Sequence, residues 1–446
     1  MKVLLINAFC LMLCLCCSEM EVKWVQNIQP AGRGTYVCND IASGYGGAVM
    51  VTGSFCGPDQ IPGCFTALYD GNGDLTWHHI YTGEPGEITY GLALGWGSLA
   101  MQTKPENYVL CQARRPDEAG RLVVLKYDNE GNLQWERTVK SGIENMYGEL
   151  MLDMQGNVVV CVWLSILGEP DNIFLAKVDP EGTLLWSTMY AHPSFYIRDV
   201  HFDMRTGEQI IVGGIADVSE DFFYLRYGEQ GNLQSLTIVN LESKEQACAA
   251  VRLGANGSVY LTGASESDTS YKDFVTAMLD AKDSLVWVQY HDGDKHDDAA
   301  TAIAVDEAGN AYVTGMSTDD YGRTRIVSMG YDVDGNKKWM STYIGSKDEN
   351  AVPYALFPPY LDRMLKDRAQ YFYLTGRVGN DILILRHGTG GLYTWAHREK
   401  SKQGGTYSLA GVAYNSLIIA ETSERGPAAL ICRYGKAEQW GCARWD

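Results

Sequence analysis

The sequence predicts an all-β protein built from about eight copies of one four-stranded unit. Three observations carry this prediction. A turn element recurs along the chain with fixed internal spacing, a second-strand element recurs between its copies, and the composition suits short strands. Gly (48 residues) and Tyr (27 residues) are abundant, while only 20% of the 446 residues are charged. Such a composition favours strands and tight turns over long amphipathic helices.

The clearest copy of the unit runs from Asp297 to Tyr343. Strand-forming runs are expected in this copy at 299–305, 311–316, 325–331 and 337–343. Polar turns at 306–310 and 332–336 join the first strand to the second and the third to the fourth. Each turn has Gly in its fourth position, where a positive φ closes a hairpin tightly.

The turn before the fourth strand places an Asp seven residues, and a Gly four residues, ahead of a Trp. The complete spacing occurs at Asp70/Gly73/Trp77, Asp128/Gly131/Trp135, Asp179/Gly182/Trp186 and Asp332/Gly335/Trp339. Two further copies keep the frame with Asp283 in the Gly place or Gly388 in the Asp place. Ser235 replaces the Trp of another copy, and a degenerate last copy ends near Trp440. The second strand recurs at 51–53, 260–263, 312–315 and 373–376, each time ending in Thr-Gly.

A four-stranded unit of this size cannot bury both of its faces alone. Radial stacking solves this problem, because each sheet then covers its neighbours around a closed circle. We therefore expect a single β-propeller of eight four-stranded blades over residues 21–446, with seven blades as the alternative count. The recurring Trp is expected to fill the space between adjacent blades. Either residues 21–28 or a strand around Trp440 adds the strand that closes the ring, and the sequence does not choose between them.

The segment from His296 to Gly315 resembles a known repeat. It contains Asp-Glu-Ala-Gly-Asn-Ala-Tyr-Val-Thr-Gly, which is similar to the strand pair of the bacterial SBBP β-propeller repeat. The resemblance implies a propeller and an exported or surface location. It implies no catalytic residues, since the family is recognised by structural positions.

Residues 1–20 are expected to form an export signal. Lys2 precedes an apolar run from Val3 to Cys17, which is too short to span a membrane as a helix. The end of this run resembles a lipoprotein signal with Cys16 or Cys17 as the lipidated residue, which would tether the protein to a membrane. We expect a periplasmic, cell-surface or extracellular location.

The net charge excludes one class of partner, and the positions of the cysteines predict their bonding. A net charge of −19 without a basic stripe excludes nucleic acid as a partner. Cys56 and Cys64 flank a turn-rich loop, and in an exported chain they are expected to form a disulfide bond. Cys111, Cys161 and Cys248 lie in apolar strand-like runs and are expected to be buried thiols, as is Cys38, while Cys432 and Cys442 of the last repeat could pair with each other.

Two groups of residues are candidates for a binding site. Asp292, Asp294 and Asp298 lie in a charged link between repeats and offer oxygen ligands for Ca²⁺, although Lys295 opposes this and a solvated loop explains the same residues. Tyrosines near the start of the first strands would surround one mouth of the channel and bind a sugar or a peptide side chain, or would simply pack between blades. These tyrosines are Tyr36, Tyr90, Tyr147, Tyr196 and Tyr407.

No catalytic motif stands out. The chain has eight His, no His-Glu-x-x-His and no Gly-x-Ser-x-Gly. We therefore expect an exported binding or scaffolding protein without a cofactor, which takes a protein or glycan on one rim of the ring. The alternatives are a propeller glycosidase or lyase acting on extracellular polysaccharide, since such sites gather from distant blades, and a subunit of an envelope-assembly complex.

Overall fold

The fold was analysed in a computed structural model. The described residues are 20–28, 35–43, 48–57, 62–97, 106–153, 155–165, 172–191, 195–202, 209–216, 221–241, 246–266, 271–293, 296–346, 349–357, 371–391, 393–400, 406–413, 416–422 and 429–436. Their regular secondary structure is entirely β-strand. In these ranges we find no helix of the length and apolar character that a membrane span requires.

The first half of the ring holds four blades, each named by its order in the chain. Blade 1 comprises β2 (Thr35–Ser43), β3 (Val49–Cys56), β4 (Gly63–Tyr69) and β5 (Leu75–Tyr81). Blade 2 comprises β6 (Ile88–Gly97), β7 (Glu106–Arg114), β8 (Gly120–Tyr127) and β9 (Leu133–Ile143). Blade 3 comprises β10 (Asn145–Leu152), β11 (Val158–Ser165), β12 (Asn172–Val178) and β13 (Leu184–Ala191). Blade 4 comprises β14 (Phe195–Phe202), β15 (Gln209–Ala216), β16 (Phe222–Gly228) and β17 (Leu233–Val239).

The second half repeats this order. Blade 5 comprises β18 (Gln246–Leu253), β19 (Val259–Glu266), β20 (Lys272–Leu279) and β21 (Leu285–His291). Blade 6 comprises β22 (Asp298–Val305), β23 (Ala311–Thr318), β24 (Thr324–Tyr331) and β25 (Lys337–Tyr343). Blade 7 comprises β26 (Ala351–Phe357), β27 (Tyr371–Val378), β28 (Asp381–Gly388) and β29 (Tyr393–Glu399). Blade 8 comprises β30 (Thr406–Ala413), β31 (Ser416–Thr422), β32 (Ala429–Lys436) and β1 (Met20–Ile28).

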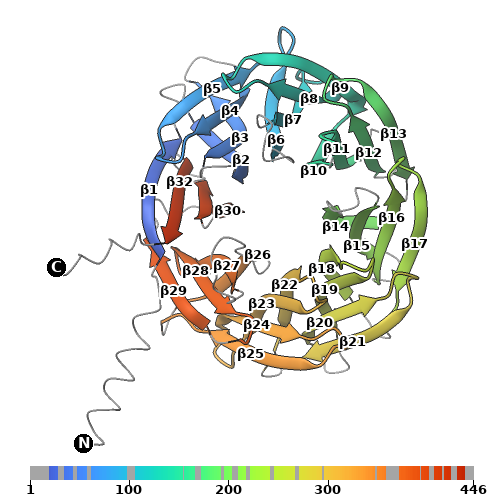
Figure 1. Ribbon diagram of the computed structural model, residues 1–446, viewed down its shortest axis with the longest axis vertical. Helices are drawn as coiled ribbons and strands as arrows, with labels where there is room; N and C mark the ends of the chain where they lie inside the picture. Colours follow the sequence, from blue (N-terminus) through green and yellow to red (C-terminus); the bar gives the residue numbers. More distant parts are fainter. Residues whose placement is uncertain are drawn as a thin grey trace, which may run out of the picture.

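The described strands thus form eight antiparallel sheets of four strands, which confirms the expected β-propeller and its larger blade count. The blades follow one another around a circle in chain order (Figure 1). The first strand of each blade lies toward the centre and the fourth lies on the circumference (Figure 1).

The N-terminal strand closes the ring. β1 pairs antiparallel with β32, from Met20 opposite Lys436 to Ile28 opposite Ala429. It becomes the outermost strand of blade 8, although the other three strands of that blade come from the end of the chain (Figure 1). Of the two closing strands that the sequence allows, residues 21–28 therefore take this role.

The repeated turn is explained by its hydrogen bonds. Asp332 Oδ1 accepts the backbone N–H groups of Asp334 (3.1 Å) and Asn336 (2.8 Å). Gly335 N donates to Asp332 O at 2.9 Å, and Gly335 has φ +81°. The Asp carboxylate is thus occupied by backbone groups of its own turn, so hairpin geometry accounts for this recurring residue without a metal.

Between blades, the indole of one blade lies on the turn Gly of the next. A Cβ placed on these glycines would lie 2.3–3.0 Å from indole atoms, so only Gly leaves room for the ring. The pairs are Trp77–Gly131, Trp135–Gly182, Trp186–Gly231, Trp287–Gly335 and Trp339–Gly391. In four of these pairs the indole N–H also reaches the same turn: Trp287 Nε1, for example, donates to Val333 O at 3.0 Å and Trp339 Nε1 to Thr389 O at 2.8 Å, whereas Trp77 Nε1 is buried without a hydrogen-bond partner among the described residues.

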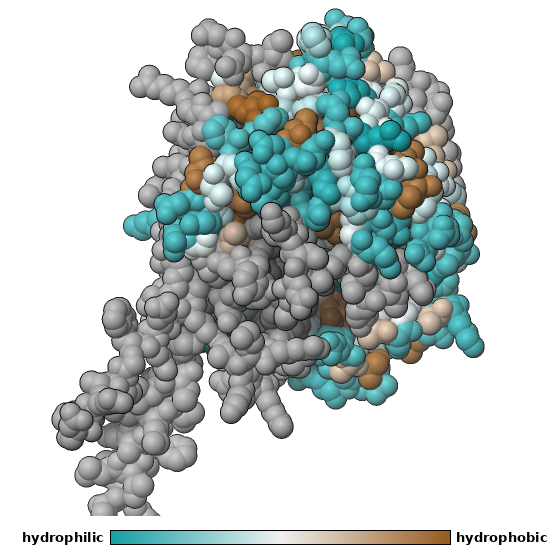
Figure 2. All heavy atoms as spheres, turned by 45° about the horizontal axis from the view of Figure 1, so that its top comes forward, coloured by the Kyte–Doolittle hydropathy of each residue, from teal (hydrophilic) through white to brown (hydrophobic). Residues whose placement is uncertain are grey.

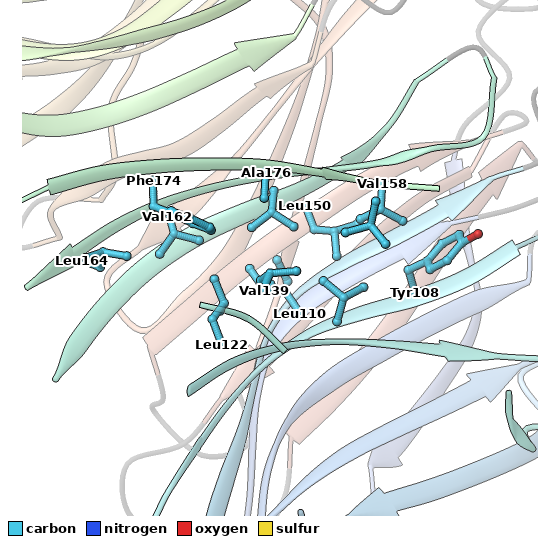
Figure 3. Close-up of a cluster of buried hydrophobic side chains, with 14 of the residues drawn as sticks. Tyr108, Leu110, Leu122, Val139, Leu150, Val158, Val162, Leu164, Phe174 and Ala176 are labelled. Atoms are coloured by element: carbon cyan, nitrogen blue, oxygen red, sulfur yellow. The ribbon is translucent and has the colours of Figure 1, made fainter. Parts of the chain in front are cut away.

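Apolar side chains fill the space nearer the axis. Between blades 2 and 3, Leu110 and Val124 of one sheet share a buried cluster with Leu150, Val160 and Phe174 of the next (Figure 3). Because each sheet is covered on both faces in this way, the middle strands are apolar almost throughout. All seven residues of β12 are buried. This burial explains why these strands lack the alternating pattern of a half-exposed sheet.

The seam between blades 4 and 5 is built differently. Ser235 replaces the Trp of blade 4, and Asp283 replaces the facing Gly of blade 5 with φ +64°. Asp283 Oδ1 accepts hydrogen bonds from Tyr224 Oη and Arg226 Nη2, both at 2.8 Å. Arg226 is only 6% exposed, so this is a largely buried ion pair. At this seam, Ser235 and Asp283 therefore replace the indole–Gly contact of the other seams by a polar contact.

This arrangement predicts that substitutions of Ser235 and of Asp283 have strongly coupled effects on the free energy of unfolding. Ser235→Trp alone places an indole against the Asp283 side chain, and Asp283→Gly alone leaves Arg226 buried without its carboxylate. Each single variant should lose stability, the second by about 3–5 kcal/mol. The double variant restores the contact found at the other seams, and we expect it to be about 1–3 kcal/mol more stable than the sum of the single losses predicts. Denaturant unfolding of the four proteins measures this coupling, and strictly additive losses would contradict it.

Candidate functional site

The two faces of the ring differ in what they carry. Because the strands are antiparallel, one face holds the turns between first and second and between third and fourth strands. The opposite face holds the connections between second and third strands and between successive blades. We call the second of these the loop face. The first strands all begin there, so the predicted site residues near their starts belong to this face.

A cluster of three carboxylates lies on the loop face where blades 5 and 6 meet. Asp273 is near the start of β20, Asp292 directly follows β21, and Asp298 begins β22. One ligand oxygen from each lies within 4.8 Å of the others. We call these three residues the carboxylate cluster. Oxygens bound to one Ca²⁺ at 2.3–2.6 Å lie at such mutual distances.

Local hydrogen bonds fix the position of Asp298. Its Oδ1 accepts the N–H of Thr318 at 3.2 Å and its Oδ2 accepts the N–H of Gly293 at 2.5 Å. A Cβ on Gly293 would lie 2.7 Å from that oxygen, so the loop can approach only with Gly at this position. Asp298 is fully buried, Asp273 is 8% exposed and Asp292 is exposed to solvent. Two carboxylates of the cluster are therefore buried, and the third, Asp292, is the one that solvent reaches.

Burial shifts the pKa of two groups at this site, Asp298 and His291. It raises the pKa of Asp298 above its ordinary value, while hydrogen bonds from Ser317, Gly293 and Thr318 and the neighbouring His291 act in the opposite direction. Burial also lowers the pKa of His291, and Lys337 lowers it further. His291 is thus held toward its neutral form beside the cluster. Such a carboxylate cluster can bind a divalent cation or a cationic group.

The structure brings together two of the three predicted metal ligands. Asp292 and Asp298 lie in the cluster, whereas Asp294 is outside the described residues. Asp273 was missed because it comes from the preceding strand. The polar pair Lys272-Asp273 at the start of the apolar run 274–279 was the available signal. The spacing of residues within one loop does not reveal Asp273, because only the pairing of strands in the sheet brings it close to the other two ligands.

Of the five predicted tyrosines, Tyr36 is fully buried and does not line a channel mouth. Its ring packs 4.6 Å from Phe55 and 5.3 Å from Phe65, measured between ring centroids. The ligand-binding prediction is therefore wrong for Tyr36, which fills the core of blade 1.

The remaining tyrosines do not share the register of Tyr36. Tyr36 lies two residues before Cys38, the last paired residue ahead of the bulge in β2. Tyr90 lies one residue before the corresponding Gly91 and is half-buried. Since side chains alternate between the faces of a sheet, Tyr90 and Tyr36 lie on opposite faces. The side chains of Tyr147, Tyr196 and Tyr407 are outside the described residues, so their role stays a prediction.

The predicted Cys56–Cys64 disulfide bond is not formed. The Cys56 thiol points to Gly57 O at the exposed end of β3. Cys64 is fully buried on β4, with its sulfur 3.7 Å from Thr52 Oγ1. Cys64 pairs with Ser54 across the β3–β4 ladder, two residues from Cys56, so the two thiols are not opposite each other. The expectation of buried thiols is confirmed for Cys38, Cys111, Cys161 and Cys248.

Carboxylates on first strands connect neighbouring blades near the axis. Asp40 Oδ2 accepts the N–H of Leu94 in the first strand of blade 2 at 2.6 Å. Asp199 Oδ2 accepts the N–H of Val251 in blade 5 at 3.0 Å and also forms an ion pair with Arg252. Burial and the charge of Glu149 raise the pKa of Asp40 to about 7. Asp40 therefore changes its charge near neutral pH.

Comparison with known proteins agrees with this architecture. Residues 286–322 match the family model described as SBBP, β-propeller repeat. The chain is a β-propeller, and one segment of it matches this repeat. The matched segment of the propeller runs from β21 through β23 and includes Asp292 and Asp298 of the carboxylate cluster. No curated protein sequence matches the chain.

The solved structures similar to this propeller support its fold alone, because their sequences are distant. A crystal structure of Sqt1 from Chaetomium thermophilum aligns with a TM-score of 0.56 at 10% identity, covering 94% of this chain and 99% of that one. A second Sqt1 crystal structure from the same organism gives a TM-score of 0.55 at 11% identity, with 94% and 100% covered.

The pKa of Asp40 predicts a pH dependence. The folded-state value of about 7 exceeds the ordinary value of 3.8, so the folded protein holds this proton more strongly than the unfolded chain does. The contribution of Asp40 to stability is therefore fully present below about pH 4 and is lost as the pH rises through about 7. Asp40→Asn stays neutral throughout. We expect this variant to gain stability relative to wild type between pH 5 and 8.

Thermal unfolding of both proteins across this pH range tests the prediction. Asp199→Asn is the matched control, since its carboxylate has Arg252 as a partner and its loss should cost stability at each pH. A difference between Asp40→Asn and wild type that does not vary with pH would contradict the assignment.

Proposed function

We propose that this propeller is a binding protein without catalytic activity, and that it takes an oxygen-rich ligand, a glycan, on its loop face through a Ca²⁺ ion. The observation that carries the proposal is the convergence of Asp273, Asp292 and Asp298, whose oxygens lie within 4.8 Å of one another. Ca²⁺ takes 6–8 oxygen ligands. Three carboxylates leave coordination positions open, which paired sugar hydroxyls can occupy.

The arrangement of the cluster supports a binding role. Its three residues come from a strand start, a link and the next strand start, so the rigid seam between two blades holds them. Asp292 is exposed, which leaves the site accessible from the loop face. In the view of Figure 2, the described residues at the surface are mainly hydrophilic, with small hydrophobic areas separated by polar ones. Such a surface suits a polar ligand better than a broad apolar partner.

We also propose that the protein is exported. The expected signal covers residues 1–20, and β1 begins at Met20. Removal of the signal near this point would leave residues 21–28 free to close the ring. If the chain is lipidated instead, Cys16 or Cys17 would carry the lipid only a few residues ahead of β1. Cell fractionation with N-terminal sequencing tests this proposal, and a cytoplasmic chain that retains its first residues would contradict it.

Calcium binding provides the direct test of the proposed site. In calorimetric titration, the full chain should bind Ca²⁺, and excess Ca²⁺ should raise its unfolding temperature, because a ligand that binds only the folded state stabilises it. Asp292→Asn changes an exposed side chain and should weaken binding at least tenfold, equivalent to about 1.4 kcal/mol, without altering the fold. Asp334→Asn, an exposed carboxylate on the turn face, should leave the affinity unchanged.

The ligand is then tested with a glycan array, with and without Ca²⁺. Retention of a glycan that is lost in the Asp292→Asn variant supports the proposal. Absence of Ca²⁺ binding, or equal binding by both variants, would refute the site. Ca²⁺ binding without any glycan, together with capture of a protein, would assign the surface to a protein partner.

A further inference from the structure

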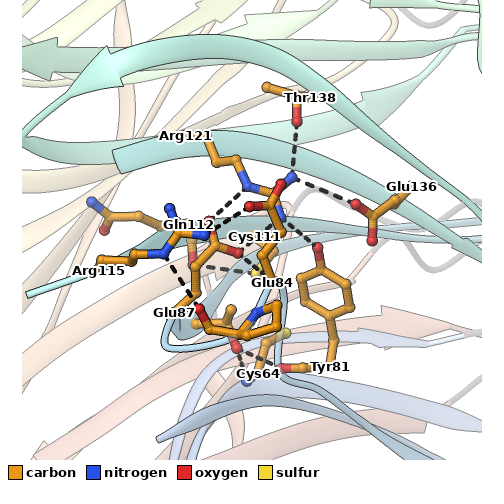
Figure 4. A network of polar contacts seen from close by, with 12 residues as sticks. Cys64, Tyr81, Glu84, Glu87, Cys111, Gln112, Arg115, Arg121, Glu136 and Thr138 are labelled. Carbon is orange, nitrogen blue, oxygen red and sulfur yellow. Dashed lines mark hydrogen bonds and ion pairs between the residues drawn. The ribbon is translucent and has the colours of Figure 1, made fainter. Parts of the chain in front are cut away.

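Two buried thiols meet between blades 1 and 2. Cys64 lies on β4, the third strand of blade 1, and Cys111 lies on β7, the second strand of blade 2. Both are fully buried, and Cys64 lies close enough to Cys111 to raise the pKa of its thiol. Both belong to the apolar cluster that fills this seam. They lie below the polar network of Arg121 (Figure 4).

Because Gly91 lacks a side chain, the two thiols can lie close together. It is paired with Cys111 in the β6–β7 ladder. A Cβ on Gly91 would lie 3.0 Å from Cys64 Sγ and 2.2 Å from Thr52 Oγ1. Any other residue would therefore displace the Cys64 side chain from the position next to Cys111. Gly91, in the first strand of blade 2, therefore has no side chain at the place where the Cys64 thiol of blade 1 enters the seam.

We propose that Cys64 and Cys111 form a disulfide bond that joins blades 1 and 2 when the chain folds under oxidising conditions. This pairing replaces the Cys56–Cys64 bond that the sequence favours. It connects two blades rather than the two ends of one loop, and it encloses residues 65–110. The proposal rests on the geometry of the seam and is independent of the ligand bound on the loop face.

The reaction needs an oxidant, and a small disulfide such as oxidised glutathione supplies it. The thiolate of one cysteine attacks the glutathione disulfide, forms a mixed disulfide and releases one glutathione thiolate. The second cysteine loses its proton and attacks the protein sulfur of the mixed disulfide, releasing the other glutathione. Two protein thiols are oxidised, and one glutathione disulfide is reduced to two thiols.

The environment of the thiols sets when this reaction occurs. Burial, together with the neighbouring Cys64, raises the pKa of the Cys111 thiol, so the thiolate is scarce in the folded protein. The ion pair of Arg121 with Glu87, at 2.9 Å, lies over the same seam (Figure 4). The bond therefore forms while the seam is still closing, or during its transient opening. Once formed, it is shielded from reductants.

The other described thiols provide controls. Cys161 is buried between blades 3 and 4, where its neighbours include Phe223 and Leu225, and its nearby charge is Glu149. A Cys161→Ser variant keeps the number of cysteines equal to that of Cys111→Ser but leaves the seam of blades 1 and 2 intact. Cys56 is exposed and tests the alternative pairing.

The experiment refolds the full chain in a mixture of reduced and oxidised glutathione, alkylates the remaining thiols, and maps the unreduced peptides by mass spectrometry. We expect a peptide pair joined through Cys64 and Cys111 in the wild type and in Cys161→Ser. In Cys111→Ser, Cys64 should be found alkylated. Recovery of Cys64 bonded to Cys56, or of both seam thiols alkylated in the oxidised wild type, would overturn the proposal.

A second measurement covers variants that fold poorly. The wild type refolded with oxidised glutathione should unfold several degrees higher than the wild type refolded and kept in a reductant throughout, because the crosslink restricts the unfolded chain. Cys161→Ser should show the same shift. Equal unfolding temperatures of the wild type refolded with oxidised glutathione and the wild type refolded under reductant would show that no stabilising bond joins the two blades.

Discussion

The ring depends on the contact between the indole of one blade and the turn of the next. Each sheet is too small to be stable alone, and its apolar faces are buried only against its neighbours. The indole covers the outer part of the seam, and in four of the five described pairs it donates to a backbone carbonyl of the facing turn, as Trp287 does to Val333. Gly335 and its equivalents permit this approach because they lack a side chain. The same Gly closes its own hairpin with a positive φ, so one residue serves both the blade and the seam.

The seam between blades 4 and 5 shows that the requirement is for a filled space rather than for a particular residue. Ser235 removes the indole, and the Asp283 carboxylate enters from the opposite side to meet Tyr224 and Arg226. The two changes make sense only together, since either alone leaves a cavity, a clash or an unpaired buried charge. A ring assembled from pairwise seams can accept such local exchanges, because each contact involves only neighbouring blades.

The fold could be predicted from the sequence because its signals are local. The spacing from Asp332 through Gly335 to Trp339 lies within one hairpin, and its recurrence reveals the repeat without knowledge of tertiary contacts. The residues of the candidate sites, by contrast, are brought together partly by tertiary contacts. Asp292 and Asp298 share one link and were found, but Asp273 reaches the cluster only through the pairing of β20 with its neighbours. In the same way, Cys111 lies beside Cys64 because of the seam, and no spacing along the chain predicts that. The position of Tyr36 was misjudged because a shift of one residue reverses the face on which a strand side chain lies.

The most direct test of this account compares two glycines of blade 6. Gly335 and Gly322 have similar positive φ values, +81° and +74°, but a Cβ on Gly335 would lie 2.6 Å from the indole of Trp287, whereas nothing lies within 4 Å of one on Gly322. Replacing each by Ala therefore imposes the same backbone strain, and only Gly335→Ala disturbs the seam. Denaturant unfolding should show that Gly335→Ala loses about 1–3 kcal/mol more stability than Gly322→Ala. Equal losses in the two variants would contradict the claim that indole–Gly contacts hold the blades together.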